Sequence, residues 1–294
     1  MRAFLALMRR EYLEHRGAFL YAPLVLVGLF AAAILTGSAF GRFEGRFGAI
    51  APDFQTIFEL GYAAISQAWW YYLIAALFFY YADAFNADRR NNSMLFWKSM
   101  PQSDFKILGS KLLVGLTLFP ALLFICMLLS GVLVFGAGIA ASFRLANIVV
   151  PDITAVAASW ANVSLVVLVY LAISLLWFAP FFAWVGALST VVGRWSIPLS
   201  FLLPAIVVLF ENAVEQGNGP LGGYVFQFLT QRSTLRFNGE DIRSMVLSNL
   251  PIDAPSFVAR MLAGTDWVSL LGGLAFAVVA VYAASEYRRR FIIA

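Results

Sequence analysis

The sequence has almost none of the side chains that enzymes and metal proteins use for chemistry. His15 is the only histidine and Cys126 the only cysteine among 294 residues. A metal cluster of His and Cys, a disulfide within the chain and a Cys–His nucleophilic pair are therefore excluded. The phosphate-cradling pattern GxxxxGK[ST] is also missing from the sequence. We expect a non-catalytic chain that binds no cofactor or metal itself, so that any ATP and Mg belong to another subunit.

Charged residues are scarce as well. Only 12% of the residues are charged and 62% are hydrophobic, and the mean hydropathy is +0.82. Soluble domains contain about a quarter charged residues. This composition predicts an all-α integral membrane protein in contact with lipid. The formal net charge of +4 needs no nucleic acid partner, because basic residues that face anionic lipid explain it.

Long stretches without charge set the expected number of spans, since a helix needs roughly 20 apolar residues to cross the bilayer. We predict a single transmembrane domain over residues 1–294 with six transmembrane helices. In the fourth stretch we favour one helix at about 163–188, because the polar Ser159 and Asn162 indicate loop or interface before it. The first stretch is too long for the apolar core of a signal peptide, so we expect it to be retained. The six uncharged stretches are 17–41, 60–82, 112–143, 153–193, 195–210 and 267–285.

The distribution of Lys and Arg predicts the orientation. If six helices place both ends on one side, that side receives most of the basic residues, including the run Arg288 to Arg290. Both termini are then cytoplasmic, in a multi-pass protein of the bacterial inner membrane. Residues 1–16 are expected to form an interfacial helix, acting either as a plain anchor or as a coupling element. Residues 211–266, between the fifth and sixth helices, are expected to form an extracytoplasmic cap.

An aromatic series in the second stretch offers candidates for a substrate pathway. Aromatic residues at such positions also form interface belts and helix packing, and this alternative stays open. The candidates to line a pathway are Gln67, Trp69, Trp70, Tyr71 and Tyr72.

The segment 86–110, "NADRRNNSMLFWKSMPQSDFKILGS", is basic and aromatic and lies between two apolar stretches. It is expected on the cytoplasmic side as two short helices that meet at Pro101, with Ser103 and Asp104 near the start of the second. Phe96 and Trp97 have no evident structural role in such a loop. One interpretation is that they rest among lipid headgroups, and another is that they contact a partner.

The same segment resembles the loop between the second and third spans of ABC-2 type transporter permeases. The resemblance is carried by Asp88-Arg89-Arg90, Ser93, Phe96-Trp97-Lys98-Ser99, Pro101 and Ser110-Lys111, with Met100 where leucine is usual. This motif covers about a tenth of the chain. The six-span layout with an interfacial N-terminal helix is similar to that family over nearly the whole length.

The resemblance implies that the segment is a coupling helix that docks on a separate ATP-binding subunit. It also implies a second permease, giving a homodimer or a heterodimer, and export of a substrate. Phe96 and Trp97 would then be the buried anchors, with charged residues around them that set the register. The residues assigned to this contact are Arg89, Arg90, Ser93, Phe96, Trp97, Lys98, Ser99, Pro101 and Asp104.

Two other functions compete with the exporter. A membrane scaffold or sensor would use the same ATPase contact without moving a substrate. A secondary transporter would need acidic residues within the membrane, and this interpretation is weakened if Glu59, Asp83, Glu211 and Glu286 fall at helix ends, as the stretches predict.

Overall fold

The structure is a computed structural model that describes residues 2–40, 54–91, 103–142, 153–215, 223–233 and 252–291. Within these ranges every regular element is a helix. The elements are α1 (Arg2–Arg16), the π-helical turn η1 (Gly17–Tyr21), α2 (Ala22–Phe40), α3 (Phe54–Arg90), α5 (Asp104–Leu116), α6 (Leu118–Ser142), α7 (Ile153–Val192), the 3-10 turn η2 (Gly193–Trp195), α8 (Ser196–Glu215), α9 (Gly223–Ser233), α11 (Ala254–Gly264) and α12 (Trp267–Phe291).

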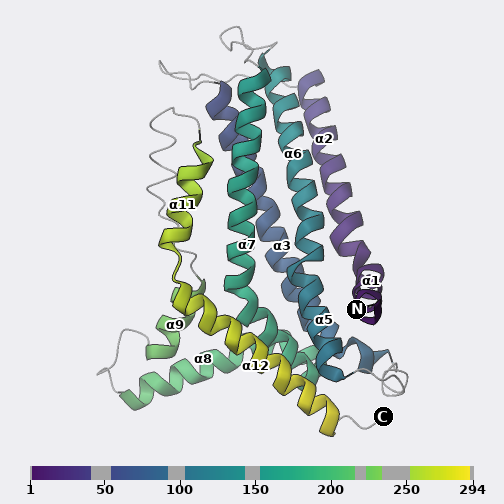
Figure 1. Cartoon of the computed structure of the whole chain (residues 1–294), viewed down its shortest axis with the longest axis vertical. Coiled ribbons are helices and arrows are strands. Elements are labelled where there is room, and N and C mark those ends of the chain that lie inside the picture. The colour runs from purple at the N-terminus through teal and green to yellow at the C-terminus, as the bar shows by residue number, and fades with distance from the viewer. Residues whose placement is uncertain are drawn as a thin grey trace.

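Four helices form the body of the molecule. In Figure 1, α2, α3, α6 and α7 run along the long axis, and α7 packs against both α3 and α12. Helix α12 crosses the lower part of the bundle obliquely and ends near α1, at the same end of the molecule. Helix α8 runs across the long axis at this end instead of along it. The beginning of α1 and the end of α12 therefore both lie in the lower part of the molecule in this view.

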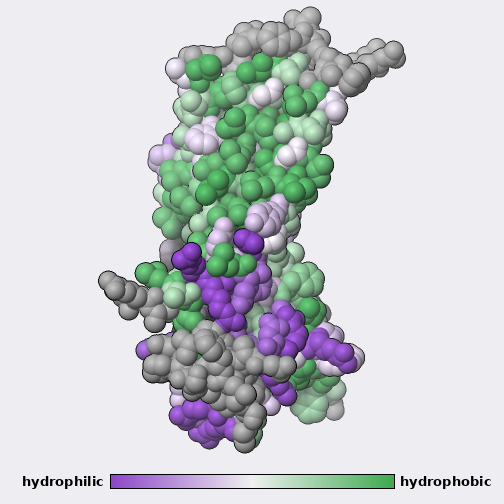
Figure 2. Space-filling model, turned by 90° about the vertical axis from the view of Figure 1, so that its right-hand side faces the viewer, coloured by the Kyte–Doolittle hydropathy of each residue, from purple (hydrophilic) through white to green (hydrophobic). Residues whose placement is uncertain are grey.

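Four helical stretches are long and apolar enough to cross a membrane: Phe4–Gly37, Asp104–Ala140, Ile153–Val214 and Trp267–Phe291. In the face shown in Figure 2, hydrophobic residues cover the upper part and hydrophilic residues gather near the lower end. These features are compatible with a membrane-embedded helical protein. That the chain has six spans remains a prediction. Helix α3 is not among the four stretches, because its residues are not apolar enough, and α8 belongs to the same stretch as α7.

The start of α7 differs from the expectation. Residues 153–162 were expected as loop or interface, but they form the first turns of a helix of 40 residues. The reason is tertiary: the Ser159 hydroxyl donates a hydrogen bond of 2.5 Å to Glu59 on α3, so this polar side chain is satisfied inside the bundle. Helix α7 ends where Gly193 adopts a φ of 58°, a conformation that favours glycine. The chain then turns through η2 into α8.

The region predicted as an outer cap is described in part. Helix α9 packs against α8 and α7, and α11 packs against α7. The Trp177 indole on α7 donates to the Arg232 carbonyl at 2.7 Å, and the Arg232 guanidinium lies over the Trp177 ring at 4.4 Å from its centroid. Both helices are thus attached to the bundle. In Figure 1, α9 lies beside α8 in the lower part of the molecule, whereas the sequence predicts residues 211–266 on the side opposite the termini.

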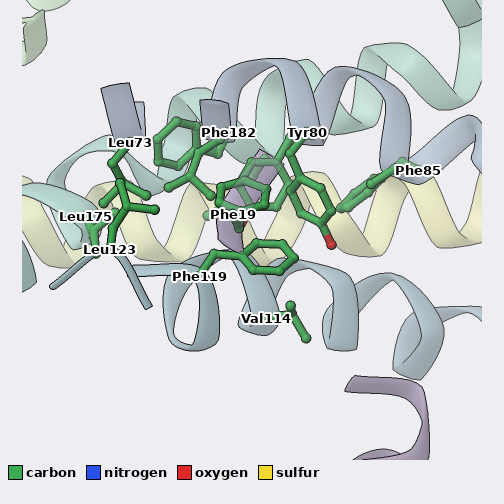
Figure 3. Packing of buried hydrophobic residues seen from close by; sticks show 14 of the residues in the cluster. Phe19, Leu73, Tyr80, Phe85, Val114, Phe119, Leu123, Leu175 and Phe182 are labelled. Carbon is green, nitrogen blue, oxygen red and sulfur yellow. The ribbon is translucent and has the colours of Figure 1, made fainter. Parts of the chain in front are cut away.

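Aromatic rings fill the core between α3, α6 and the π-helical turn. Phe19 stacks on Phe119 with ring centroids 3.8 Å apart, and Tyr80 meets Phe119 edge-on at 5.1 Å (Figure 3). Phe19 is fully buried. A π-helical turn contains an extra residue relative to an α-helix, and here that turn contains the residue that fills the core. The junction of α1 and α2 is therefore part of the core.

Packing of α6 depends on a glycine that faces two rings. A Cβ at Gly131 would lie 2.7 Å from the Trp160 indole nitrogen and 2.9 Å from a carbon of Tyr62, whereas Gly136 on the same helix has open space around it. We predict that Gly131→Ala destabilises the protein by about 1–3 kcal/mol, because both rings must move. Gly136→Ala should be neutral or stabilising, since alanine favours helices. Equal apparent melting temperatures of the two purified variants would contradict this packing.

Candidate functional site

Five ionisable side chains from four helices meet at the lower end of the bundle. They lie at the end of α3 and the start of α5, where these helices flank the segment predicted to couple to an ATPase. Asp88, Lys111 and Arg288 are almost completely buried. Buried charges are costly unless they are paired, so the positions of the helices at this end are tied to one another. We call this set the ionic cluster: Glu11 (α1), Asp88 (α3), Asp104 and Lys111 (α5) and Arg288 (α12).

Asp88 is the centre of the ionic cluster. One of its carboxylate oxygens lies 2.9 Å from Arg288 Nη1 and 3.3 Å from Lys111 Nζ, and the other lies 3.7 Å from Arg10 Nη2. Burial alone would raise the pKa of Asp88, but the charges of Lys111 and Arg288 outweigh it, so its pKa lies below the ordinary value. Because the folded-state pKa is lowered, the ionised carboxylate stabilises the fold above the usual aspartate pKa of about 4. This stabilisation is lost as the pH falls further.

Lys111 connects α5 to two other helices. Its ammonium donates to the Ala84 carbonyl at 2.6 Å and lies 3.4 Å from Glu11 Oε1. The Tyr80 hydroxyl lies 3.3 Å from the other oxygen of Glu11 and 3.2 Å from the Lys111 carbonyl. A buried ion pair gains stability only when its remaining donors and acceptors are also satisfied. Here the Ala84 carbonyl and the Tyr80 hydroxyl are the neutral partners that satisfy Lys111 and Glu11.

Arg288 bridges the two ends of the predicted coupling segment. Helix α3 ends at Arg90 and α5 begins at Asp104, where the Ser103 hydroxyl caps it by accepting from the Lys106 amide at 3.4 Å. Arg288 Nη1 donates to Asp88, which precedes the segment. Arg288 Nε lies 2.9 Å from Oδ1 of Asp104, which follows the segment, and this contact is an ion pair without an aligned hydrogen bond. One guanidinium from α12 thus holds both helices that carry the segment.

The residues assigned to the ATPase contact fall into two groups. Arg89 and Arg90 are exposed. Arg90 forms a two-point ion pair with Asp83, in which Nη2 donates to Oδ2 at 3.0 Å. Asp104 is mostly buried against Arg288. The remaining residues of this set lie outside the described residues: Ser93, Phe96, Trp97, Lys98, Ser99 and Pro101.

Sequence reasoning missed the ionic cluster. Asp88 and Lys111 were read only as parts of a motif, and Arg288 only as one of a basic run. A signal was present, because the predicted topology puts acidic and basic residues of four helix ends on the same side. Opposite charges on one face of a helix bundle that are otherwise far from water are expected to pair.

A second feature is a cavity of about 280 Å³ between α3, α7 and α11. It lies toward the other end of α3. Most of its walls are apolar, and the polar members include Thr56, Glu59, Ser66 and Gln67. Its lining is Thr56, Glu59, Leu60, Ala63, Ser66, Gln67, Trp70, Met127, Val163, Val166, Val167, Tyr170, Leu171, Ile252, Phe257 and Met261.

The candidate pathway residues divide between this cavity and other surroundings. Gln67 and Trp70 line the cavity, and Trp70 donates to Ser174 at 2.9 Å. Trp69 is buried toward α6 and donates to Ser130 at 2.9 Å. Tyr71 is 62% exposed and so faces outward, while the Tyr72 hydroxyl donates to the Ala18 carbonyl in η1. The structure therefore brings together two of the five at one cavity.

Glu59 is a buried acid inside this helical bundle. It lies in the second turn of α3, is 3% exposed, and was expected at a helix end. The Ser159 hydroxyl and the Gln55 amide donate to its Oε1 at 2.5 and 3.4 Å, and the Ile252 backbone N–H donates to Oε2 at 3.0 Å. All of these partners are neutral donors. No described cation is paired with Glu59.

Glu11, Glu14 and His15 at the end of α1 place three ligand atoms within 4.8 Å of one another. Both carboxylates already have cationic partners: Glu11 contacts Lys111, and Glu14 lies 2.7 Å from Arg10. His15 Nδ1 lies 3.1 Å from the Glu11 carbonyl. The charges of this trio are compensated within the protein, and we assign no metal to it.

Comparison with known proteins found no match among protein-family models, curated proteins or solved structures. The function of this chain has to be inferred from its own residues and their contacts.

We predict that Arg288→Met lowers stability strongly, by about 3–5 kcal/mol, because Asp88 and Asp104 lose a buried partner. The matched control is Arg289→Met, since Arg289 is 68% exposed and its described ion pair is with Glu286, three residues earlier on α12. That control should change stability by less than about 1 kcal/mol. The measurement is the apparent melting temperature of each purified variant. If both variants melt alike, the ionic cluster does not hold the helices together.

Proposed function

We propose that this chain is the membrane subunit of an ATP-driven exporter of the ABC-2 type, moved by a separate ATP-binding subunit. The observation that carries the proposal is the bridge made by Arg288 between Asp88 and Asp104. A force on residues 92–102 acts on the ends of α3 and α5. Through Arg288 and Lys111 the same force reaches α12 and α1.

This arrangement suits a transmitting element better than a lipid anchor. A loop that only rests in headgroups needs no buried ionic connection from its flanking helices to two other helices. Such a connection is costly unless it is complete, so it restricts the relative movement of the helix ends. Movement of one end then requires movement of the others, which is the property that a subunit driven from outside the membrane needs.

The remaining parts of the proposal follow from the sequence. The chain has no phosphate loop, so ATP and Mg are assigned to the partner. The end of the bundle where hydrophilic residues gather in Figure 2 is assigned to the cytoplasmic face of a bacterial inner membrane. A second copy of the permease completes the working unit, in contact with lipid over its apolar surface.

Glu59 favours a second candidate function. A buried acid beside a cavity is the feature that a proton-driven secondary transporter requires, and sequence reasoning had assigned this acid to a helix end. The two candidates differ in energy source. Export that follows a pH gradient in the absence of ATP would support the second candidate and contradict the first.

The proposed function predicts two separable defects. The test system is the purified chain reconstituted in liposomes with a P-loop ATPase, sought first among the neighbouring reading frames. Phe96→Ala with Trp97→Ala should weaken the complex at least about tenfold, because each anchor is worth roughly 2 kcal/mol. Asp104→Asn should leave the complex intact but lower the stimulation of ATP hydrolysis, because the connection to Arg288 is weakened.

The matched control is Arg289→Gln, an exposed residue outside the predicted ATPase contact, whose ion pair with Glu286 lies within α12. It should change assembly by less than about threefold, as exposed pairs contribute little. Full assembly and full ATPase stimulation with the Phe96/Trp97 double variant would overturn the assignment. Residues 92–102 would then be a membrane-surface loop.

A further inference from the structure

We infer that the cavity between α3, α7 and α11 binds a single-headed organic cation, such as an alkylammonium, with its charged group at Glu59 and its apolar body directed toward Trp70. The inference rests on the proposed function for its meaning, because the bound molecule would be the transported substrate. It names a chemical class for that substrate. The binding itself requires neither ATP nor a partner subunit.

The acid at one end of the cavity is arranged as an acceptor. Each described partner of Glu59 donates a hydrogen bond to it, and each is neutral. An ionised carboxylate has about four acceptor positions and no donor. Ser159, Gln55 and the Ile252 amide therefore suit the charged form and leave capacity for a further donor or a cation.

The rest of the described lining has no charge to balance this acid. Among its sixteen residues no Lys, Arg or His occurs. An anionic ligand would place a second negative charge beside Glu59 in surroundings of low polarity, which is strongly unfavourable. A cation would instead supply the missing counter-charge. The lining thus discriminates by charge as well as by size.

A second polar atom points to a ligand independently of Glu59. The Ser66 hydroxyl is buried, lines the cavity, and has no hydrogen-bond partner among the described residues. Ser66 lies two turns beyond Glu59 on the same face of α3. Buried hydroxyls without partners are costly, so a polar group of a bound molecule is the natural occupant of this position.

The shape of the cavity favours an extended molecule with one charged end. From Glu59 to Trp70 the rise along α3 is about 16 Å. Between them the wall is mainly aliphatic, with Val163, Val167 and Leu171 from α7. Trp70 and Tyr170, whose ring centroids are 5.7 Å apart, form the far end. An alkyl chain gains from burial along such a wall.

The test compares two probes of the same chain length and opposite charge, octyltrimethylammonium and octanesulfonate. Their binding to the purified full-length chain in nanodiscs is measured by calorimetry, with empty nanodiscs as the lipid background. We expect the cation to bind at least about tenfold more tightly than the anion, a difference of about 1.4 kcal/mol. Equal binding of the two probes, or no binding above the lipid background, would overturn the inference.

Two pairs of variants locate the site. Glu59→Gln should lower cation binding about tenfold or more, whereas Glu286→Gln, at a partly exposed acid of α12 that pairs with Arg289, should leave it unchanged. Val167→Phe fills the cavity and should block the probe. Val279→Phe, at a 63% exposed position of α12 outside the cavity lining, should not. Unchanged cation binding in both Glu59→Gln and Val167→Phe would overturn the inference.

The outcome is separable from that of the proposed function. If Glu59→Gln fails to fold, the comparison of the two probes on the unmodified chain still decides the matter. A chain that assembles with its ATPase but does not prefer the cation would keep the exporter and lose this substrate class. A chain that prefers the cation but needs no ATPase would keep the binding site and lose the exporter.

Discussion

The pairing of one buried carboxylate with cations from other helices is the constraint on which the rest of the structure depends. Asp88 lies near the end of a helix of 37 residues and cannot stay ionised away from water without Arg288 and Lys111. To supply those partners, α5 and α12 must reach the same level as the end of α3. Glu11 brings α1 there for the same reason. The aromatic core around Phe19 then fills the space between helices whose ends are already fixed.

The acids near the two ends of α3 have opposite surroundings. Asp88 and Glu59 are separated by about 44 Å of helix, and both are buried. Asp88 is neutralised by arginine and lysine, whereas the described partners of Glu59 are neutral. A carboxylate that is paired with cations of other helices holds those helices together. A carboxylate without a described cationic partner can still attract a cation from outside the protein. One helix thus joins a mechanical connection at one end to a candidate recognition site at the other.

Sequence alone predicted the helical membrane class, because composition and long apolar stretches depend on no tertiary contact. It also placed Ser103 and Asp104 at the start of a helix, since capping is local. It failed for residues 153–162, where the partner of Ser159 is Glu59, 100 residues away. The ionic cluster was missed for the same reason. The crosswise direction of α8 follows from the turn at Gly193 and from packing, which hydropathy does not report.

The bridge made by Arg288 also has a consequence for biosynthesis. Asp88 is 200 residues ahead of Arg288 in the chain, so it is made and inserted long before its main partner exists. Until α12 is made, Asp88 and Asp104 lack the guanidinium that pairs with both of them, and the acids of the ionic cluster outnumber its cations. A chain truncated before α12 would keep that imbalance. The ion pairs of Arg288 that tie the helix ends together therefore form only after α12 has been translated, later than the contacts among α3, α6 and α7.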